Sequence, residues 1–153
     1  MTKILFICHG NICRSPMAEF IMKDIADKKG MAEDLYISSA ATSTEELGNP
    51  VYRPVRVLLG QLGINCDEKR ARRIVKSDYE DFDLLIGMDE ANIRNMHYAF
   101  GGDPEGKIYK LLSFAGTDRD VADPWYTRDF QKTLQDVSIG CNALFDYIYG
   151  GRS

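Results

Sequence analysis

Residues 8–16 (CHGNICRSP) join a short apolar run to a segment of helical periodicity, and this junction constrains the fold more than any other feature of the chain. The apolar run, residues 4–7 (ILFI), is typical of a buried strand. After Pro16, apolar residues recur at helical spacing as far as about Lys29. Pro16 suits a first helical turn, because it lacks the N–H that would have no partner there. The sequence therefore predicts a tight turn from a strand directly into a helix N-terminus.

The composition of this turn predicts a binding site for an anion. Gly10 and Asn11 readily adopt positive φ, which allows successive backbone N–H groups to point inward. The helix N-terminus adds unpaired N–H groups and a partial positive charge. Arg14 contributes a planar fork of donors that matches the oxygens of a phosphate. We expect a phosphate-binding cup formed by Cys8, His9, Gly10, Asn11, Ile12, Cys13, Arg14 and Ser15.

Cys8, at the lip of this cup, is predicted to attack phosphorus. The thiolate is the reactive form of cysteine, and a helix N-terminus with a nearby cation favours it. Ser15 is suited to hydrogen-bond the sulfur and help it leave. A cysteine that ends a strand is usually a small core residue, and Cys8 with Cys13 could also be half of a metal site or a disulfide. The combination of residue types at a strand-to-helix junction favours the nucleophile.

Two other sites with similar sequence elements fit less well. The turn lacks the Gly-Lys-Ser/Thr ending of a nucleotide-binding P-loop. A zinc site would need a second pair of ligands at short spacing. The remaining candidates provide no such pair: His9, His97, Cys66 and Cys141. We therefore expect no metal.

Length and charge limit the remaining possibilities. The chain has 153 residues, the size of one ordinary domain, so we expect residues 1–153 to form a single domain. Its net charge of −4 is spread over mixed charges, which argues against a nucleic-acid partner. No apolar run approaches membrane-spanning length, and the N-terminus leads straight into a predicted strand, so we expect neither membrane association nor a cleaved signal peptide. Four cysteines without a disulfide-scaffold pattern favour the cytoplasm.

Strand and helix patterns alternate along the rest of the chain. This alternation predicts an α/β three-layer sandwich, with a mostly parallel sheet and helices on both faces, whose ligands bind beyond the carboxyl ends of the strands. The basic run at residues 69–73 is predicted to be a solvated face. Strands are expected at residues 35–39, 84–88 and 107–112. Helices are expected at residues 55–62, 89–96 and 137–148. Asp89 is the expected cap of the second of these helices, and Gly150 and Gly151 mark the expected end of the third.

At these residues the sequence resembles the low-molecular-weight protein tyrosine phosphatases, whose signature is Cys-x5-Arg-Ser near the N-terminus. The resemblance covers nearly the whole chain. It includes residues 8–16, 39–43 (SAATS), 48–50 (GNP), 88–90 (MDE) with Asn92, and 123–126 (DPWY). It implies a four-stranded parallel sheet, no cofactor, tyrosine-phosphorylated proteins as partners and inorganic phosphate as product.

The reaction implied by the resemblance has two steps. Cys8 attacks phosphorus while Arg14 and the loop amides hold the phosphate oxygens, and a phosphocysteine forms. A carboxylic acid must protonate the departing phenol, and it later activates the water that hydrolyses the intermediate. Spacing alone does not choose among Asp118, Asp120 and Asp123. The resemblance selects Asp123, because the acid of the family belongs to an Asp-Pro pair.

The resemblance also suggests roles around the reaction centre. Asn11 is expected to brace the loop, with Ser39 nearby, and Cys13 is a candidate redox partner of Cys8, although it fits equally well as a small buried residue. Close relatives that act on phosphoarginine carry Thr where this chain has Ile12, which favours phosphotyrosine. Two positions depart from the family: Glu45 replaces a frequent aromatic and Lys69 a frequent histidine. The expected substrate pocket consists of Ile12, Glu45, Trp125 and Tyr126.

Three alternative functions share parts of this pattern. A thiol-dependent arsenate reductase needs two further cysteines close together, whereas Cys66 and Cys141 are far apart in sequence. A protein-arginine phosphatase is opposed by Ile12 and the aromatic residues. A phosphotyrosine-binding module without activity is opposed by the intact set of Cys8, Arg14 and Asp123, because a pure binder gains nothing from a nucleophile.

Overall fold

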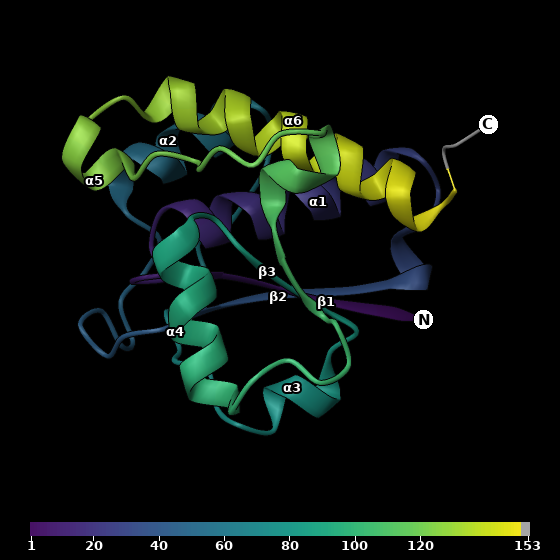
Figure 1. Cartoon of the computed structure of the whole chain (residues 1–153). Helices are drawn as coiled ribbons and strands as arrows, with labels where there is room; N and C mark the ends of the chain where they lie inside the picture. The colour runs from purple at the N-terminus through teal and green to yellow at the C-terminus, as the bar shows by residue number, and fades with distance from the viewer. Residues whose placement is uncertain (151–153) are drawn as a thin grey trace.

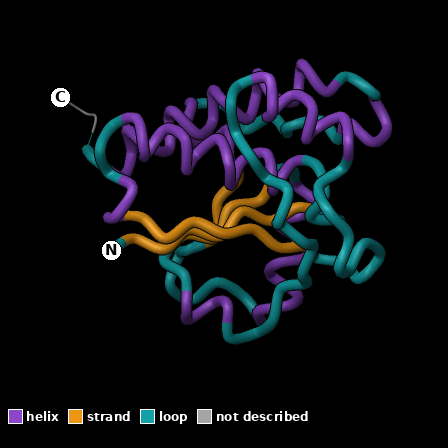
Figure 2. The backbone as a smooth tube through the Cα atoms, turned by 180° about the vertical axis from the view of Figure 1, so that it is seen from behind, coloured by secondary structure: helices purple, strands orange, loops and turns teal. Residues whose placement is uncertain are grey.

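The computed structural model describes residues 1–150, in which four parallel strands form a single sheet with the order β2-β1-β3-β4. Figure 1 shows helices α1, α2, α5 and α6 on one face of this sheet and helices α3 and α4 on the other, and Figure 2 shows the same layers from behind. The predicted α/β three-layer sandwich is confirmed. The strands are β1 (Thr2–Cys8), β2 (Leu35–Ala41), β3 (Leu84–Gly87) and β4 (Ile108–Lys110).

The helices follow the strands in alternation, as expected. One face carries α1 (Arg14–Lys28), α2 (Arg53–Gln61), α5 (Pro124–Thr127) and α6 (Phe130–Ile148), and the other carries α3 (Asp78–Asp81) and α4 (Glu90–Phe100). Short 3-10 helices occupy Ala32–Asp34 and Leu111–Ala115.

β1 is the central strand, and its sequence explains why. Ile4 and Phe6 are fully buried in the core beneath α1 and α6, whereas Leu5 and Ile7 are fully buried in the core on the α4 side. A strand covered on both faces needs a continuous apolar run rather than an alternating pattern. β1 pairs with β2 and β3, so the carboxyl ends of all three strands meet at one edge of the sheet, where Cys8 lies.

Several element boundaries differ from the predicted ones. α6 begins at Phe130 rather than near residue 137, because its first two turns are mostly polar and give little hydrophobic signal. Asp129 starts that helix by accepting a hydrogen bond from the backbone N–H of Lys132 at 3.0 Å. β4 ends at Lys110, where a 3-10 turn takes over. Gly150 has a φ of 74°, in keeping with a helix end, and Gly151 lies outside the described residues.

Gly140 is the point of closest approach between α6 and the 3-10 turn. A Cβ added there would lie 2.4 Å from Cγ of Leu111, which is fully buried. Gly140→Ala is therefore expected to overpack the core and to lower the free energy of unfolding by about 1–3 kcal/mol. In α2, by contrast, a Cβ on Gly60 would meet no atom within 4 Å, so Gly60→Ala should stabilise the helix by about 0.5–1 kcal/mol. Urea unfolding of both variants tests whether the free energy of unfolding falls in Gly140→Ala and rises in Gly60→Ala. Equal changes in the two variants would contradict the prediction.

Candidate active site

The predicted phosphate-binding segment, residues 8–15, runs from the last residue of β1 into the first turn of α1, at the carboxyl end of the sheet. It forms the floor of a pocket of ≈ 110 Å³. This pocket brings together the loop, residues 45–46 and residues 123–126, which are far apart in the sequence. Glu46 was not foreseen, because nothing in its sequence context distinguishes it from other loop carboxylates. The pocket is lined by Cys8, His9, Gly10, Ile12, Cys13, Arg14, Glu45, Glu46, Asp123, Trp125 and Tyr126.

The sulfur of Cys8 is surrounded by hydrogen-bond donors. Its Sγ lies 2.9 Å from the hydroxyl oxygen of Ser15. It also accepts hydrogen bonds from the backbone N–H groups of Asn11 at 3.3 Å and of Ser15 at 3.4 Å. The Cys8 side chain is buried, so these donors replace water around the sulfur. These donors are in position to hydrogen-bond the sulfur when it acts as a nucleophile and as a leaving group.

Arg14 is held rigidly below the pocket. Its Nη1 donates to Oδ2 of Asp89 at 2.7 Å and to the backbone oxygen of Val121 at 2.8 Å. Its Nη2 lies 3.6 Å from Oδ2 of Asp123. Burial disfavours its charge, but the negative charges of Cys8 and Asp89 raise the pKa of Arg14 above the usual value. The guanidinium is thus permanently cationic, with Nη1 anchored by Asp89 and Val121 and Nη2 facing the pocket near Asp123.

Asp89 both caps helix α4 and accepts a hydrogen bond from Arg14. It is the N-cap of α4, and its side chain accepts from the backbone N–H of Asn92 at 2.8 Å, while the side chain of Asn92 accepts from the backbone N–H of Asp89 at 3.2 Å. This capping box fixes the carboxylate that in turn orients Arg14. The cap was visible in the sequence, whereas its contact with Arg14 was not.

Asn11 holds the loop in its conformation. Its φ is 60°, in the left-handed region that asparagine tolerates better than most residues. Its side-chain nitrogen donates to the hydroxyl oxygens of Ser15 and Ser39, both at 2.9 Å. Its side-chain oxygen accepts from the backbone N–H of Arg72 at 3.2 Å. Because Ser15 accepts from Asn11, its own proton can be donated either to Cys8, at 2.9 Å, or to the backbone oxygen of Ala40, at 3.5 Å.

The same network continues to a buried carboxylate. The hydroxyl of Ser39 donates to Oε1 of Glu19 at 2.6 Å. Glu19, 4% exposed, is flanked by two ammonium groups, that of Lys23 at 2.6 Å and that of Lys69 at 3.3 Å. Lys69 also donates to the backbone oxygen of Ser39 at 2.8 Å. Burial lowers the pKa of Lys69, and the charge of Glu19 opposes this effect.

The prediction of a solvated basic face at residues 69–73 is therefore wrong in part. The side chain of Lys69 is only 12% exposed, and Arg72 pairs with the buried Asp78 through two hydrogen bonds, at 3.1 and 3.2 Å. The segment pairs with the chain at Ala41 and Pro50 and has no regular period of its own, so sequence could not tell which cations turn inward.

Replacing Lys69 by methionine tests this network. Lys69→Met leaves the buried Glu19 with one cation instead of two, so the free energy of unfolding is expected to fall by about 1–3 kcal/mol. Lys28→Met is the matched control, because the Lys28 side chain is 70% exposed and its pair with Asp24 lies on the surface. Its effect should stay below about 0.5 kcal/mol. Denaturant unfolding at neutral pH measures both, and a negligible loss in Lys69→Met would contradict the role given to the network.

Asp123 is the one aspartate of its segment that lines the pocket. Its Oδ1 caps α5 by accepting from the backbone N–H of Trp125 at 3.0 Å, which leaves Oδ2 facing Arg14. Asp120 is engaged elsewhere, since it pairs with Lys110 at 3.0 Å. Asp118 does not line the pocket. Of the three aspartates that sequence spacing could not distinguish, only Asp123 therefore lines the pocket.

The remaining cysteines differ from Cys8 in their surroundings. Burial, followed by the negative charge of Cys8, raises the pKa of Cys13 to about 12, so Cys13 remains a thiol at neutral pH. Burial also raises the pKa of the Cys141 thiol and of the Cys66 thiol, and neither lines the pocket. All four cysteines are unpaired, and no cluster of His, Cys, Asp and Glu suited to a metal occurs among residues 1–150.

Aromatic side chains form one wall of the pocket. Trp125 packs against Tyr52 with ring centroids 5.0 Å apart, and the guanidinium of Arg128 lies 5.9 Å from the Trp125 ring. On the other side, Nε2 of His9 lies 3.0 Å from Oε2 of Glu45. Tyr52 and Arg128 were missed by the sequence, because their contacts join distant segments.

A parallel α/β sheet that delivers a cysteine into a ring of amide donors, with an arginine behind it and a carboxyl group across the pocket, is the architecture of phosphatases that use a cysteine nucleophile. Comparison with known protein families identifies the family within this class of phosphatases. Residues 3–150 match the family model described as low molecular weight phosphotyrosine protein phosphatase. The chain belongs to this family.

Individual relatives agree with this membership. The low molecular weight protein-tyrosine-phosphatase YfkJ of Bacillus subtilis is 38% identical over 146 residues, which cover 94% of each chain. Its crystal structure superposes with a TM-score of 0.95 at 37% identity and covers 100% of this chain and 98% of that chain. SP-PTP of Streptococcus pyogenes gives 0.86 at 40% identity, covering 96% and 93% of the chains. The structure of DARP, a drosophila arginine phosphatase, gives 0.87 at 29%, covering 96% and 98%.

Proposed function

We propose that this protein hydrolyses phosphotyrosine in proteins, with Cys8 as nucleophile, Arg14 and the loop amides as phosphate ligands, and Asp123 as acid and then base. The observation that carries the proposal is the set of donors around the Cys8 sulfur, at 2.9, 3.3 and 3.4 Å. These donors are placed to stabilise the sulfur as it attacks phosphorus and as it departs.

In the first step, the thiolate of Cys8 attacks phosphorus in line with the bond to the phenol oxygen. The S–P bond forms as the P–O bond breaks, and Asp123 transfers its proton to the departing oxygen. Arg14 and the loop N–H groups bind the three equatorial oxygens, whose charge is spread out in the transition state. The phosphocysteine and a neutral tyrosine result.

In the second step, water attacks the phosphocysteine. Asp123, now ionised, accepts a proton from this water as the new P–O bond forms. The P–S bond breaks and the electron pair returns to sulfur, where the hydroxyl of Ser15 donates a hydrogen bond to the departing thiolate. Inorganic phosphate leaves, and the enzyme regains its starting state.

Phosphotyrosine is favoured over phosphoarginine by the pocket walls. Ile12 lines the pocket with Trp125 and Tyr126, and this apolar surface suits a flat phenyl ring better than a charged guanidinium. Arsenate reduction is disfavoured, because neither Cys66 nor Cys141 lines the pocket. We also propose that residues 1–153 act as one phosphatase domain in the cytoplasm. No helix among residues 1–150 is long and apolar enough to cross a membrane.

Rates measured side by side test the proposal. The purified protein is given a phosphotyrosine peptide, a phosphoarginine peptide, and arsenate with thioredoxin as reductant. Phosphotyrosine should be hydrolysed fastest, with release of inorganic phosphate. Equal or faster cleavage of phosphoarginine would assign the protein to the arginine branch, and binding of phosphotyrosine without turnover would make it a binding module.

Glu45 at the rim is expected to affect peptide preference. It lines the pocket beside Glu46, and its side chain is 68% exposed. Glu45→Lys reverses the charge there, so kcat/KM for a phosphotyrosine peptide with acidic neighbours should rise by about two- to fivefold relative to one with basic neighbours. Leu47→Lys, on the same exposed loop but outside the pocket, is the control. The same shift in both variants would show that general charge, rather than the rim, is responsible.

A further inference from the structure

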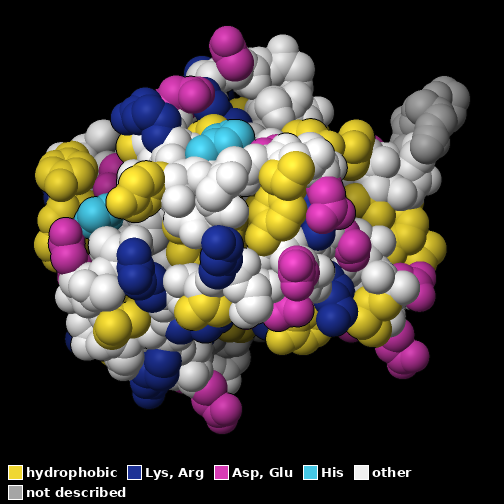
Figure 3. Space-filling model, turned by 60° about the horizontal axis from the view of Figure 1, so that its bottom comes forward, with side chains coloured by type: hydrophobic (Ala, Val, Ile, Leu, Met, Phe, Trp, Pro, Cys, Tyr) yellow, Lys and Arg dark blue, Asp and Glu magenta, His cyan; other side chains and the backbone are white. Residues whose placement is uncertain are grey.

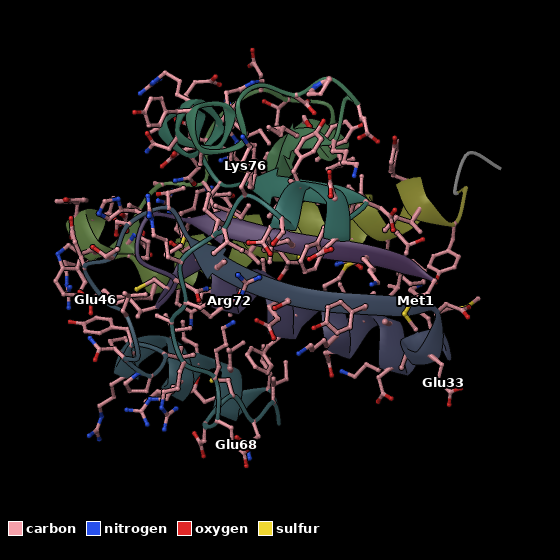
Figure 4. All side chains as sticks on the ribbon, turned by 90° about the horizontal axis from the view of Figure 1, so that it is seen from below. Met1, Glu33, Glu46, Glu68, Arg72 and Lys76 are labelled. Atoms are coloured by element: carbon pink, nitrogen blue, oxygen red, sulfur yellow. The ribbon has the colours of Figure 1, made fainter. Side chains whose placement is uncertain are left out.

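A second groove borders the pocket, on the side opposite the aromatic wall. Its volume is ≈ 660 Å³, and it lies between the segments at residues 42–43 and 73–76 and the helix α4. His9 lines both cavities, so the groove continues from the rim of the pocket. Figure 3 shows Lys and Arg side chains on the face of the molecule that carries this groove, and Figure 4 shows Lys76 beside α4, well away from Glu46 at the left end.

The cations of this groove are not neutralised within the described chain. Arg73 and Lys76 are exposed, and neither forms an ion pair with a carboxylate among residues 1–150. Arg72 provides the contrast, because its charge is matched by Asp78 at 3.1 Å. The Arg73 side chain is also oriented, since its Nε donates to the backbone oxygen of Thr42 at 3.3 Å. Arg73 and Lys76 therefore bring two positive charges without an ion-pair partner among residues 1–150 into the same groove.

A second feature of the groove is its neutral polar lining. Ser43 lies on one wall, and Asn95 and Tyr98 from α4 lie on another. The groove therefore offers both positive charge and hydrogen-bonding groups to a polar ligand.

Charge differs in sign between the rim of the pocket and the groove. Glu45 and Glu46 line the pocket, Arg73 and Lys76 line the groove, and His9, which lies 3.0 Å from Glu45, lines both. A polypeptide whose phosphotyrosine occupies the pocket and whose chain runs past His9 would meet the two cations of the groove beyond the acidic rim. An extended chain advances about 3.3 Å per residue, so a few residues are enough to pass from the pocket into a groove that shares one of its lining residues.

We propose that this groove binds acidic side chains of the substrate protein, located on one side of the phosphotyrosine. The proposal rests on the phosphatase activity proposed above and deepens it, since it defines the class of substrate: phosphotyrosine followed or preceded, on one side only, by Asp or Glu. Carboxylates pair with Arg73 and Lys76, and the acidic rim formed by Glu45 and Glu46 disfavours acidic residues directly beside the phosphotyrosine.

Three peptides and two double variants test the proposal. The peptides carry phosphotyrosine with Glu at the second to fifth positions on the N-terminal side, with Glu at the same positions on the C-terminal side, or with Gln throughout. Wild type is expected to prefer one acidic peptide over the Gln peptide by about three- to tenfold in kcat/KM at low salt. The preference should disappear in Arg73→Gln/Lys76→Gln. It should persist in Lys28→Gln/Lys29→Gln, which removes the same charge at the C-terminal end of α1, away from both cavities.

The outcomes separate the groove from the phosphatase activity. An acidic-to-Gln ratio that is unchanged in Arg73→Gln/Lys76→Gln, or lowered equally in the Lys28 and Lys29 control, overturns the groove while leaving the activity intact. Equal rates of the wild type on all three peptides do the same. A wild type that fails to hydrolyse free phosphotyrosine, which is too small to reach the groove, overturns both. A rise in salt should reduce the preference, because exposed pairs are screened.

Discussion

Cys8→Ser is expected to lower kcat for a phosphotyrosine peptide by about 10⁴-fold or more, because the serine hydroxyl does not ionise at neutral pH even among the donors that hold the thiolate. The loop should keep its shape, since the substituted oxygen can accept the same hydrogen bonds from Asn11 and Ser15. Phosphate binding should therefore survive, which calorimetry with inorganic phosphate measures. Loss of both binding and turnover would indicate a collapsed loop rather than a missing nucleophile.

A matched control comes from the chain itself. Cys66 is also buried, but it does not line the pocket. Cys66→Ser should retain turnover, whatever its effect on stability. In the wild type, rapid quenching during turnover followed by mass spectrometry should detect phosphate on the peptide that contains Cys8. Ordinary hydrolysis by Cys8→Ser, or phosphate on another residue, would contradict the mechanism.

The sequence could predict the features that depend on residues close together in the chain, such as strands, turns and helix caps. The apolar run of β1, the turn after it and Arg14 lie within a few residues of one another, so both the buried strand and the tight turn into a helix could be inferred directly. Asp89 was recognisable as a cap for the same reason, because the signal for a helix start is local. The order of strand and helix patterns then limited the fold to an α/β sandwich.

Contacts between distant segments could not be predicted in this way. Asp89 anchors Arg14, and Lys69 supports the loop through Glu19, although neither contact leaves a periodic signal in the sequence. The choice of Asp123 among the neighbouring aspartates needed either the resemblance or the pocket geometry. Whether a charged side chain turns inward depends on the position of its buried partner. Composition alone predicted that residues 69–73 face solvent, whereas Lys69 in this run turns toward Glu19.

The second large effect is expected at Asp123. Asp123→Asn keeps a side-chain oxygen for the cap on α5 but cannot supply a proton, so kcat for phosphotyrosine should fall by about 10²–10³-fold. KM should stay about the same, because the amide has nearly the shape of the protonated carboxyl group that the first step requires and keeps its place near Nη2 of Arg14. Steady-state kinetics with a phosphotyrosine peptide measure both constants, and the variant should retain phosphoproteins from a lysate that the wild type releases.

Leaving-group dependence distinguishes a missing acid from a damaged pocket. An aryl phosphate with a strongly acidic phenol needs little protonation, so Asp123→Asn should lose much less activity on it than on phosphotyrosine. A deformed pocket would slow both substrates equally. Asp118→Asn and Asp120→Asn are the controls, because neither aspartate lines the pocket, although Asp120 pairs with Lys110. If turnover of phosphotyrosine were unaltered in Asp123→Asn and lost in one of the controls, the acid would have to be reassigned to that residue, and the approach of Asp123 to Arg14 would be merely structural.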